Sequence, residues 1–412
     1  MKVHIKTLGC RTNQYDSAVI QALLEKAGHE VLAEADHAEA VIVNTCAVTS
    51  RAESKNGQAL RRALKEHPGA RVLAAGCGPA FNRPAYESID GLSGIFGVND
   101  GAGILKALGA LSPEKTTPFD EAAGLNDRTR AHIKIQEGCD AFCAYCVVPF
   151  VRGAPVSRPA DEIAAHAEKL IGLGFPELVL TGIHVGRYRD GSTDLGGLIS
   201  RLASLKGDFR LRLSSIEPAE VTDRIVDLVL SDPKVCNHLH ISLQSGDDRV
   251  LSAMNRRYLA RDFFGLVERI RKKDASCGLG TDVIAGFPAE GEGEFRNTLE
   301  RISDSGLTYG HVFPFSLRKG TAAEKYAKQV APQVKAGRCR LLKETFTRLK
   351  SAFAQTLVGR EARVVAESGK KALASNYLRV ILEGKTGQGK LFRVRITGAE
   401  NGDLKGRPDG DA

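Results

Sequence analysis

Strand-like and helix-like segments alternate along the first quarter of this 412-residue chain, and no other feature constrains its fold as strongly. Apolar strand patterns fall at residues 3–8, 40–45 and 71–75, and amphipathic helical spacing falls between them, at residues 17–27 and 52–66. A βαβαβ order of this kind places neighbouring strands parallel in one sheet. We therefore expect an α/β fold that begins with a doubly wound parallel sheet.

Each of these three strands ends in a cysteine, and we call Cys10, Cys46 and Cys77 the N-terminal triad. The carboxyl ends of parallel strands lie at one edge of a sheet, where α/β folds bind their ligands. Three unrelated buried cysteines remain the alternative, because single buried cysteines are common. Their identical placement favours one shared metal-cluster site with three protein ligands.

Six further strand patterns follow and are separated by helical stretches, at residues 133–135, 178–181, 210–213, 238–243, 279–284 and 311–315. Six βα units form a partial barrel of the TIM type, whose chemistry lies at the carboxyl ends of the strands. A C-x3-C-x2-C motif follows the first of these strands and is called here the loop triad: Cys139, Cys143 and Cys146.

Three thiols within eight residues, with no fourth cysteine or histidine nearby, do not match a structural zinc site, which closes with four ligands. A [4Fe–4S] cluster held by three thiolates keeps one iron open for a further ligand. We favour the cluster, with zinc and plain structural cysteine as the alternatives. Cys236, Cys277 and Cys339 have no partner spacing and are interpreted as ordinary hydrophobic residues.

The C-terminal fifth of the chain is basic. The net charge is +9, and residues 331–412 hold 17 Lys or Arg against 8 Asp or Glu. A helix is predicted over residues 332–355, and strands with glycine-rich turns after Gly359 predict a small β-barrel, an architecture that often binds oligonucleotides. The charge fits RNA and fits a solvated surface equally well. Tyr377 and Phe392 would stack on bases or pack in the barrel core.

The polar, proline-containing stretch 113–131 predicts a linker. No apolar run approaches the roughly 20 residues that cross a bilayer, and the N-terminus lacks the pattern of a signal peptide. We expect a cytoplasmic protein with no membrane partner and with cysteines that are reduced or metal-bound. The expected domains are an N-terminal domain, a partial barrel, a connecting basic helix and a C-terminal barrel, at residues 1–118, 119–330, 331–355 and 356–412.

The two cysteine sets and the tail resemble the radical S-adenosylmethionine (SAM) methylthiotransferases. The resemblance is carried by Gly9-Cys-Arg-Thr-Asn-Gln-Tyr-Asp-Ser, Val43-Asn-Thr-Cys, Ala75-Gly-Cys, and the stretch from Gln136 through Cys146 to Arg152-Gly153. The pair Arg11-Thr12 and the tail motif Ser375-Asn-Tyr-Leu-Arg-Val are most similar to the branch that acts on N6-threonylcarbamoyladenosine in tRNA. The isopentenyladenosine branch usually has Gln-Met after its first cysteine, and the ribosomal-protein branch has Pro-Lys.

The resemblance implies two [4Fe–4S] clusters, one on each triad, a radical-SAM partial barrel and a TRAM-like RNA-binding barrel. It also implies SAM as cofactor, tRNA as partner and an electron donor such as a flavodoxin or ferredoxin. Strand-end residues that would contact SAM are Gly182, Ser214, Ser215 and Gln244; no catalytic side chain is assigned. Methylthiolation of isopentenyladenosine or of a ribosomal protein, and a non-catalytic RNA-binding metalloprotein, are the alternatives.

Overall fold

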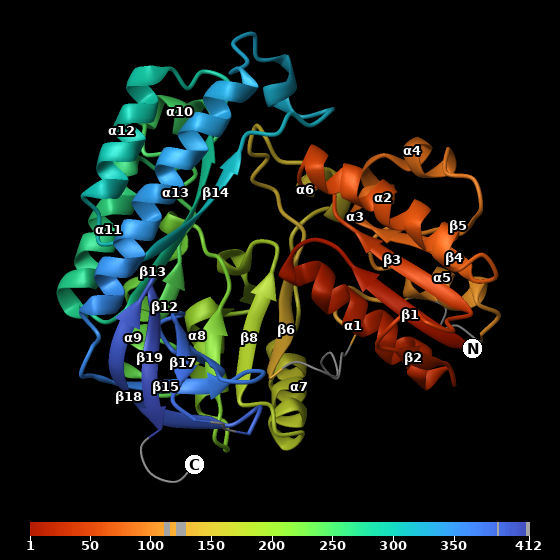
Figure 1. The fold of residues 1–412 in the computed structure, drawn as a ribbon, viewed down its shortest axis with the longest axis horizontal. Helices are drawn as coiled ribbons and strands as arrows, with labels where there is room; N and C mark the ends of the chain where they lie inside the picture. The colour runs from red at the N-terminus through yellow and green to blue at the C-terminus, as the bar shows by residue number, and fades with distance from the viewer. Residues whose placement is uncertain (111–115, 121–128, 385–386, 409–412) are drawn as a thin grey trace.

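A parallel five-stranded sheet forms the N-terminal part of the protein in the computed structural model, which describes residues 1–110, 116–120, 129–384 and 387–408 (Figure 1). Its strands have the order β2-β1-β3-β4-β5: β1 (Lys2–Thr7), β2 (Glu30–Leu32), β3 (Ala40–Thr45), β4 (Arg71–Gly76) and β5 (Leu92–Ile95). Apolar clusters cover both faces, so the sheet is doubly wound as expected. The strands β2 and β5 at the two edges were not predicted, because they are short and only partly buried.

The helices of this part are α1 (Arg11–Lys26), α2 (Ser50–Glu66), α3 (Cys77–Phe81), α4 (Arg83–Glu87) and α5 (Gly101–Ala107). The prediction that the first helix begins at Ser17 was wrong, because α1 starts directly after Cys10. The first turns of α1 bury Asn13 and Ser17, which are polar. The apolar periodicity therefore begins later than the helix does.

Six parallel strands form the second part, a partial barrel. They are β6 (Arg130–Glu137), β8 (Glu177–Gly182), β11 (Arg210–Leu213), β12 (His238–His240), β13 (Gly278–Ala285) and β14 (Tyr309–Pro314). Parallel pairing joins β6, β8 and β11 and also β12, β13 and β14, and isolated parallel bridges link the two sets. The short strand β7 (Val156–Ser157) runs antiparallel beside β6, and β9 (Arg189–Asp190) pairs with β10 (Thr193–Asp194). Most of the predicted linker 113–131 lies outside the described residues.

Helices cover the outside of the barrel: α7 (Ala160–Gly172), α8 (Leu195–Ala203), α9 (Asp223–Ser231), α11 (Ala260–Lys273), α12 (Glu292–Ser303) and α13 (Pro332–Gln355), with α6 (Val148–Arg152) and α10 (Asp248–Ala253) at the strand ends. The helix α13 packs along β14 and joins two cores. Leu342 and Phe346 belong to the core of the partial barrel, and Phe353 belongs to the core of the C-terminal part. No helix of the described residues is long and apolar enough to cross a membrane.

The C-terminal part is a closed five-stranded barrel of order β15-β16-β17-β19-β18. Its strands are β15 (Glu361–Ala366), β16 (Lys371–Ala374), β17 (Arg379–Leu382), β18 (Leu391–Glu400) and β19 (Asp403–Pro408). The strand β17 begins only at Arg379, because Tyr377 has a φ of 71° and breaks the extended backbone before it. Phe392 packs against the barrel core, whereas Tyr377 leaves the barrel and stacks on His238 of β12.

Two buried arginines fasten this barrel to the partial barrel. Arg210 and Arg212 both pair with the fully buried Glu177, at 2.6 and 2.8 Å, and both donate to backbone carbonyls of residues 373–375. Burial acts to raise the pKa of Glu177, but the charges of Arg212 and Arg210 outweigh it and hold that pKa far below its usual range. The carboxylate is therefore ionised, and both arginines present their remaining N–H groups to the C-terminal barrel.

Candidate cluster sites and the interface between them

The N-terminal triad gathers at the carboxyl edge of the first sheet. Cys10 precedes α1, Cys46 follows β3, and Cys77 follows β4 as the first residue of α3. The Oδ1 of Asn13 lies 3.9 Å from Cys10 Sγ and 3.7 Å from Cys77 Sγ, so two of the thiols meet at one buried amide. The structure thus brings together three cysteines that are 67 residues apart from first to last.

The backbone at Gly9 leaves space for these thiols. Gly9 has a φ of 113°, and a Cβ placed there would lie 2.8 Å from the Cβ and 3.1 Å from the Sγ of Cys46. A side chain at this position would be strained and would collide with the site. Glycine before Cys10 is therefore required for the cysteines to approach each other.

The loop triad lies at the end of β6, between that strand and α6. Cys139 Sγ lies 3.5 Å from His184 Nδ1 and accepts a backbone N–H from Ala141 at 3.4 Å. Cys143 Sγ accepts a hydrogen bond from Arg256 Nη1 at 3.3 Å. The ring of Tyr145 is partly buried and packs against Phe287, whereas Phe142 keeps 54% of its surface exposed.

Burial raises the pKa of thiols in both triads. Burial raises the pKa of Cys77 to about 11, against the lowering effect of the Arg152 charge. Burial likewise raises the pKa of Cys146 to about 12, and the charges of Cys143 and Cys139 add to the rise. Thiolates this close together repel one another. A bound metal cation removes that repulsion and stabilises all three as thiolate ligands.

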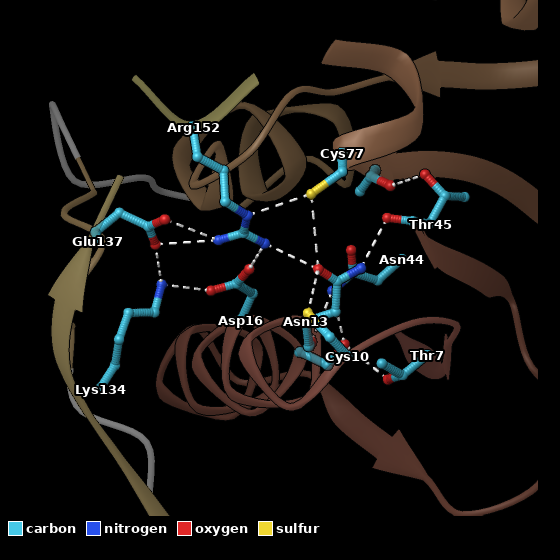
Figure 2. A network of polar contacts seen from close by, with 12 residues as sticks. Thr7, Cys10, Asn13, Asp16, Asn44, Thr45, Cys77, Lys134, Glu137 and Arg152 are labelled. Carbon is cyan, nitrogen blue, oxygen red and sulfur yellow. Dashed lines mark hydrogen bonds and ion pairs between the residues drawn. The ribbon is translucent and has the colours of Figure 1, made fainter. Parts of the chain in front are cut away.

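One buried arginine links the two triads (Figure 2). Arg152, the last residue of α6, donates through Nε to Cys77 Sγ at 3.3 Å and through Nη2 to Asn13 Oδ1 at 2.8 Å. On its other side it pairs with Glu137, at the end of β6, at 3.0 Å, and with Asp16 of α1 at 2.8 Å. Arg152 follows Cys146 by six residues and Glu137 precedes Cys139 by two, so the arginine joins the loop of one triad to a thiol of the other.

A lysine completes this group, which we call the arginine network: Arg152, Lys134, Asp16, Glu137 and Asn13. Lys134 Nζ lies 2.6 Å from both Asp16 and Glu137. The side chains of Lys134, Arg152 and Glu137 are at most 4% exposed. Buried charges contribute little net stability but strongly penalise a misplaced partner. The network therefore defines how the first sheet sits on the barrel.

Both triads fit iron–sulfur clusters by the chemistry of their donors. Each offers three soft thiol ligands. Each also has a guanidinium N–H that donates to a sulfur, from Arg152 in one triad and from Arg256 in the other. Such hydrogen bonds stabilise anionic sulfur and tune cluster potentials.

A cavity of about 280 Å³ adjoins the loop triad and is lined by Cys143, His184, Glu217, Glu220 and Arg256, among others. His184 Nε2 lies 2.9 Å from Glu220, and Arg256 pairs with Glu217. Burial opposes the charged imidazole, but hydrogen bonds to Cys139 and Glu220 raise the pKa of His184 to about 9. None of these four polar residues was assigned to the site from the sequence, because no motif or spacing marks them.

None of the four expected SAM contacts lines this cavity. Gly182 lies at the end of β8, and a Cβ there would meet the carbonyl of Gln136 at 2.7 Å. Ser214 is buried with an unpartnered hydroxyl, whereas Ser215 is exposed. Gln244 has a φ of 66°, an uncommon conformation for a residue other than glycine. All four lie at carboxyl strand ends of the barrel, and their contact with SAM stays a prediction.

The interior of the partial barrel, which we call the lumen, is polar. His240, Asp282 and His311 form a lumen triad, in which each imidazole places one nitrogen 3.1 Å from Asp282 Oδ1. Burial would raise the pKa of Asp282, but interactions with the imidazoles of His240 and His311 outweigh it and lower that pKa. Their ligand atoms lie within 4.8 Å of one another, close enough to hold a metal ion. His311 Nδ1 forms a hydrogen bond with Asp282, whereas His240 Nε2 has no hydrogen-bond partner among the described residues.

Comparison with known proteins agrees with this architecture. A family model described as uncharacterized protein family UPF0004 matches residues 2–96, and the radical SAM superfamily model matches residues 133–302. Among solved structures, the radical SAM methyltransferase TsrM from Kitasatospora setae has a TM-score of 0.56 at 15% identity, over 78% of this chain and 76% of that one. This likeness shows the fold alone. The fold and the family match together define a radical SAM enzyme, whose class uses SAM and a [4Fe–4S] cluster.

Full-length relatives narrow the class. The chain is 35% identical, over 87% of its length and 85% of the relative, to a protein from Chlamydia pneumoniae named threonylcarbamoyladenosine tRNA methylthiotransferase MtaB. It is 32% identical to the Bacillus subtilis (strain 168) protein of that name, over 96% of this chain and 93% of the relative. It is also 34% identical, over 98% of both chains, to tRNA-2-methylthio-N(6)-dimethylallyladenosine synthase from Cereibacter sphaeroides. The chain belongs to the radical SAM tRNA methylthiotransferases, a family that carries two clusters.

Proposed function

We propose that this protein adds a methylthio group to C2 of N6-threonylcarbamoyladenosine next to the anticodon of tRNA. The observation that carries the proposal is the arginine network, which binds the loop triad and the N-terminal triad into one interface. A radical generated at one site is useful only if the group to be transferred is held close by. Shared hydrogen bonds between the two sites support that closeness.

In this proposal the loop triad and the N-terminal triad would each hold one [4Fe–4S] cluster. When bound, the two clusters would supply the electron that cleaves one SAM and the sulfur that is transferred, and a second SAM would supply the methyl group on that sulfur. The adenine C2–H bond is unactivated, so acid–base chemistry cannot replace that hydrogen, and a carbon radical derived from SAM can. A flavodoxin or ferredoxin is the proposed electron donor.

The residues of the chain hold and protect this chemistry. Arg152 and Arg256 donate hydrogen bonds to Cys77 and Cys143 and would stabilise their thiolates. Tyr145, next to Cys146 of the loop triad, is partly buried against the apolar cluster that contains Phe287. His184, held between Cys139 and Glu220, supplies a charged imidazole at the cavity wall.

The C-terminal barrel is proposed to hold tRNA through phosphate contacts. Arg393 and Arg407 keep 74% and 72% of their side chains exposed on this barrel. Binding through such groups weakens steeply with salt. The sequence left Tyr377 either to stack on bases or to pack in the barrel core; its ring instead stacks on His238 and lies beside Tyr309.

The choice of modified adenosine rests on Arg11-Thr12, on the tail motif and on the relatives named MtaB. Identity alone does not decide it, because the dimethylallyladenosine relative is 34% identical. That isopentenyl-type base is therefore the second candidate substrate.

The test is mass spectrometry of nucleosides from tRNA of cells with and without this gene. We expect the methylthio form of N6-threonylcarbamoyladenosine to disappear on deletion and to return with the wild-type gene. If the methylthio form of isopentenyladenosine disappears instead, the second candidate is the substrate and the first is wrong. No change in any methylthio nucleoside would overturn it in favour of a protein substrate or a non-catalytic role.

A further inference from the structure

Arg11 occupies the place where all three parts of the molecule meet. It is the first residue of α1, directly after Cys10, and it is partly buried. Its Nη2 donates a hydrogen bond to the hydroxyl of Tyr377, from the C-terminal part, at 2.6 Å. Its guanidinium carbon lies 5.7 Å from the centre of that ring.

Arg11 differs from the buried arginines of this protein in having no carboxylate partner among the described residues. Each of the buried arginines forms an ion pair with an Asp or Glu: Arg152, Arg158, Arg210, Arg212, Arg318 and Arg338. Arg11 has the Tyr377 hydroxyl as its hydrogen-bond acceptor, which leaves further N–H donors of its planar fork available. Removing a cation from water without an anion is costly, so this position fits a bound anion.

The surroundings of Arg11 form the floor of the lumen. The ring of Tyr377 stacks on His238, at 4.6 Å between centroids, and lies 5.4 Å from Tyr309. The hydroxyl of Tyr309 lies 2.8 Å from His238 and 3.0 Å from His240. Burial and then the charges of Arg212, His240 and Arg11 lower the pKa of His238, so the ring on which Tyr377 stacks is neutral.

One face of β14 leads from this floor to the mouth of the lumen. Tyr309, His311 and Phe313 alternate along β14 and share one face, while Val312 is buried on the other. His311 and Phe313 are exposed, which leaves this face open to a ligand. At about 3.3 Å per residue, the rise from Tyr309 to Phe313 is roughly 13 Å. That rise separates the Tyr309 end of this face from its exposed end at Phe313.

We propose that Arg11, oriented by Tyr377, binds the carboxylate of the threonylcarbamoyl group on the target adenosine and selects bases that carry this anion. The inference rests on the proposed function and adds the residue that reads the substrate. C2 and C6 of adenine flank N1 on one edge of the ring, and C6 carries N6. A base that presents C2 to the clusters therefore directs its N6 substituent into the same lumen, where Arg11 follows the cluster ligand Cys10 directly.

The chemistry separates the two candidate substrates. The threonylcarbamoyl group ends in a carboxylate, which a planar guanidinium binds with two parallel hydrogen bonds. The isopentenyl group is apolar and uncharged, and it would leave Arg11 without an anion. A site built around a buried polar donor rejects a ligand that cannot pair with it.

The test compares three anticodon stem-loop RNAs on the reconstituted full-length enzyme: one with N6-threonylcarbamoyladenosine, one with its methyl ester and one with isopentenyladenosine. The ester removes the charge and keeps the shape. For the wild type we expect a kcat/KM for the acid about 10- to 100-fold above that for the ester. In Arg11→Gln we expect the acid to fall to the level of the ester, while the ester is unchanged.

An affinity measurement, two further variants and two folding checks make the kinetic result interpretable. Affinity for each RNA, measured by fluorescence anisotropy without SAM, should show the same loss for the acid alone. Tyr377→Phe should give a smaller loss, of several-fold, because the guanidinium remains and loses only its orienting hydroxyl. Arg62→Gln, an exposed arginine of α2, is the matched control and should behave as the wild type. Iron content and circular dichroism check that each variant is folded.

The outcomes separate the two proposals. If wild-type enzyme modifies none of the RNAs, or only the isopentenyl RNA, both the proposed substrate and the role of Arg11 are overturned. If the wild type prefers the acid and Arg11→Gln keeps that preference in a folded enzyme, only the role of Arg11 is overturned. If the wild type treats acid and ester alike, the lumen does not read the carboxylate and the inference is wrong.

Discussion

The two cysteine triads differ in how far apart their members lie in the sequence. The loop triad spans eight residues between β6 and α6, whereas the N-terminal triad spans 68 residues and three strand ends. The local arrangement is nevertheless the same in both. Each triad has three thiols, and one thiol in each accepts a hydrogen bond from a guanidinium N–H at 3.3 Å. A local motif and a folded sheet edge can therefore present equivalent donor sets. The difference predicts that the loop triad tolerates changes in distant packing and that the N-terminal triad does not.

The largest effect is expected from Cys143→Ala, which removes one ligand of the loop triad. Formation of 5′-deoxyadenosine should fall below detection, and iron should fall by about half, because each cluster contributes four irons. The measurements are chromatography of the SAM products and iron analysis of the purified variant. Continued release of 5′-deoxyadenosine would falsify the assignment of this triad.

Cys46→Ala removes one ligand of the N-terminal triad and leaves the loop triad intact. Iron should again fall by about half. SAM cleavage should continue, however, and tRNA should gain no methylthio group, because the radical site is intact and the sulfur site is lost. The two activities are measured in the same reaction mixture. If this variant still methylthiolates tRNA, the N-terminal triad is not the sulfur site.

Arg152→Gln should give a smaller, intermediate effect, because it keeps every cysteine and removes the link between the triads. Asp16 and Glu137 would share only Lys134, and breaking a buried ion pair costs about 3–5 kcal/mol. We expect faster hydrogen exchange in α1 and less methylthio product per molecule of 5′-deoxyadenosine. Arg152→Lys, which keeps the charge, should recover part of the coupling. Equal coupling in wild type and Arg152→Gln would show that the network is only structural.

The smallest effect is expected from Cys277→Ala, a fully buried cysteine outside both triads. It should leave iron content and both activities unchanged and lower the free energy of unfolding by about 1 kcal/mol through lost packing. Iron analysis and denaturant unfolding measure the two quantities. A loss of iron here would mean that the triads do not account for all cluster ligands.

Much of the fold follows from local patterns. The parallel sheet, the six barrel strands and the long helix α13 match the periodicities that predicted them, because burial of one face imposes a repeat that can be read within about ten residues. The elements that were missed are short or weakly buried, such as β2 and β16. The start of α1 was misplaced because its first turns face a polar interface and carry no apolar repeat. The expected domain boundaries stay predictions.

Part of the candidate site could likewise be predicted from local patterns, and part could not. The positions of all six cysteines relative to strand ends were apparent in the sequence, because a strand end and a cysteine are both local features. The roles of Arg152 and Asn13 were not, since they meet across 139 residues. The sequence also contained no sign that three charged residues line the cavity: Glu217, Glu220 and Arg256. Nothing in their spacing distinguishes them from surface charges.

The sequence by itself determined the class of chemistry, through the loop triad, and the parallel sheet that would gather a second triad. Only the tertiary structure decided that Arg152 joins the two triads and that Tyr377 of the last domain meets Arg11 of the first, 366 residues away. The reason is physical. Periodicity and ligand spacing are set by the geometry of a few neighbouring residues, whereas the pairing of buried charges depends on which surfaces pack together once the whole chain has folded.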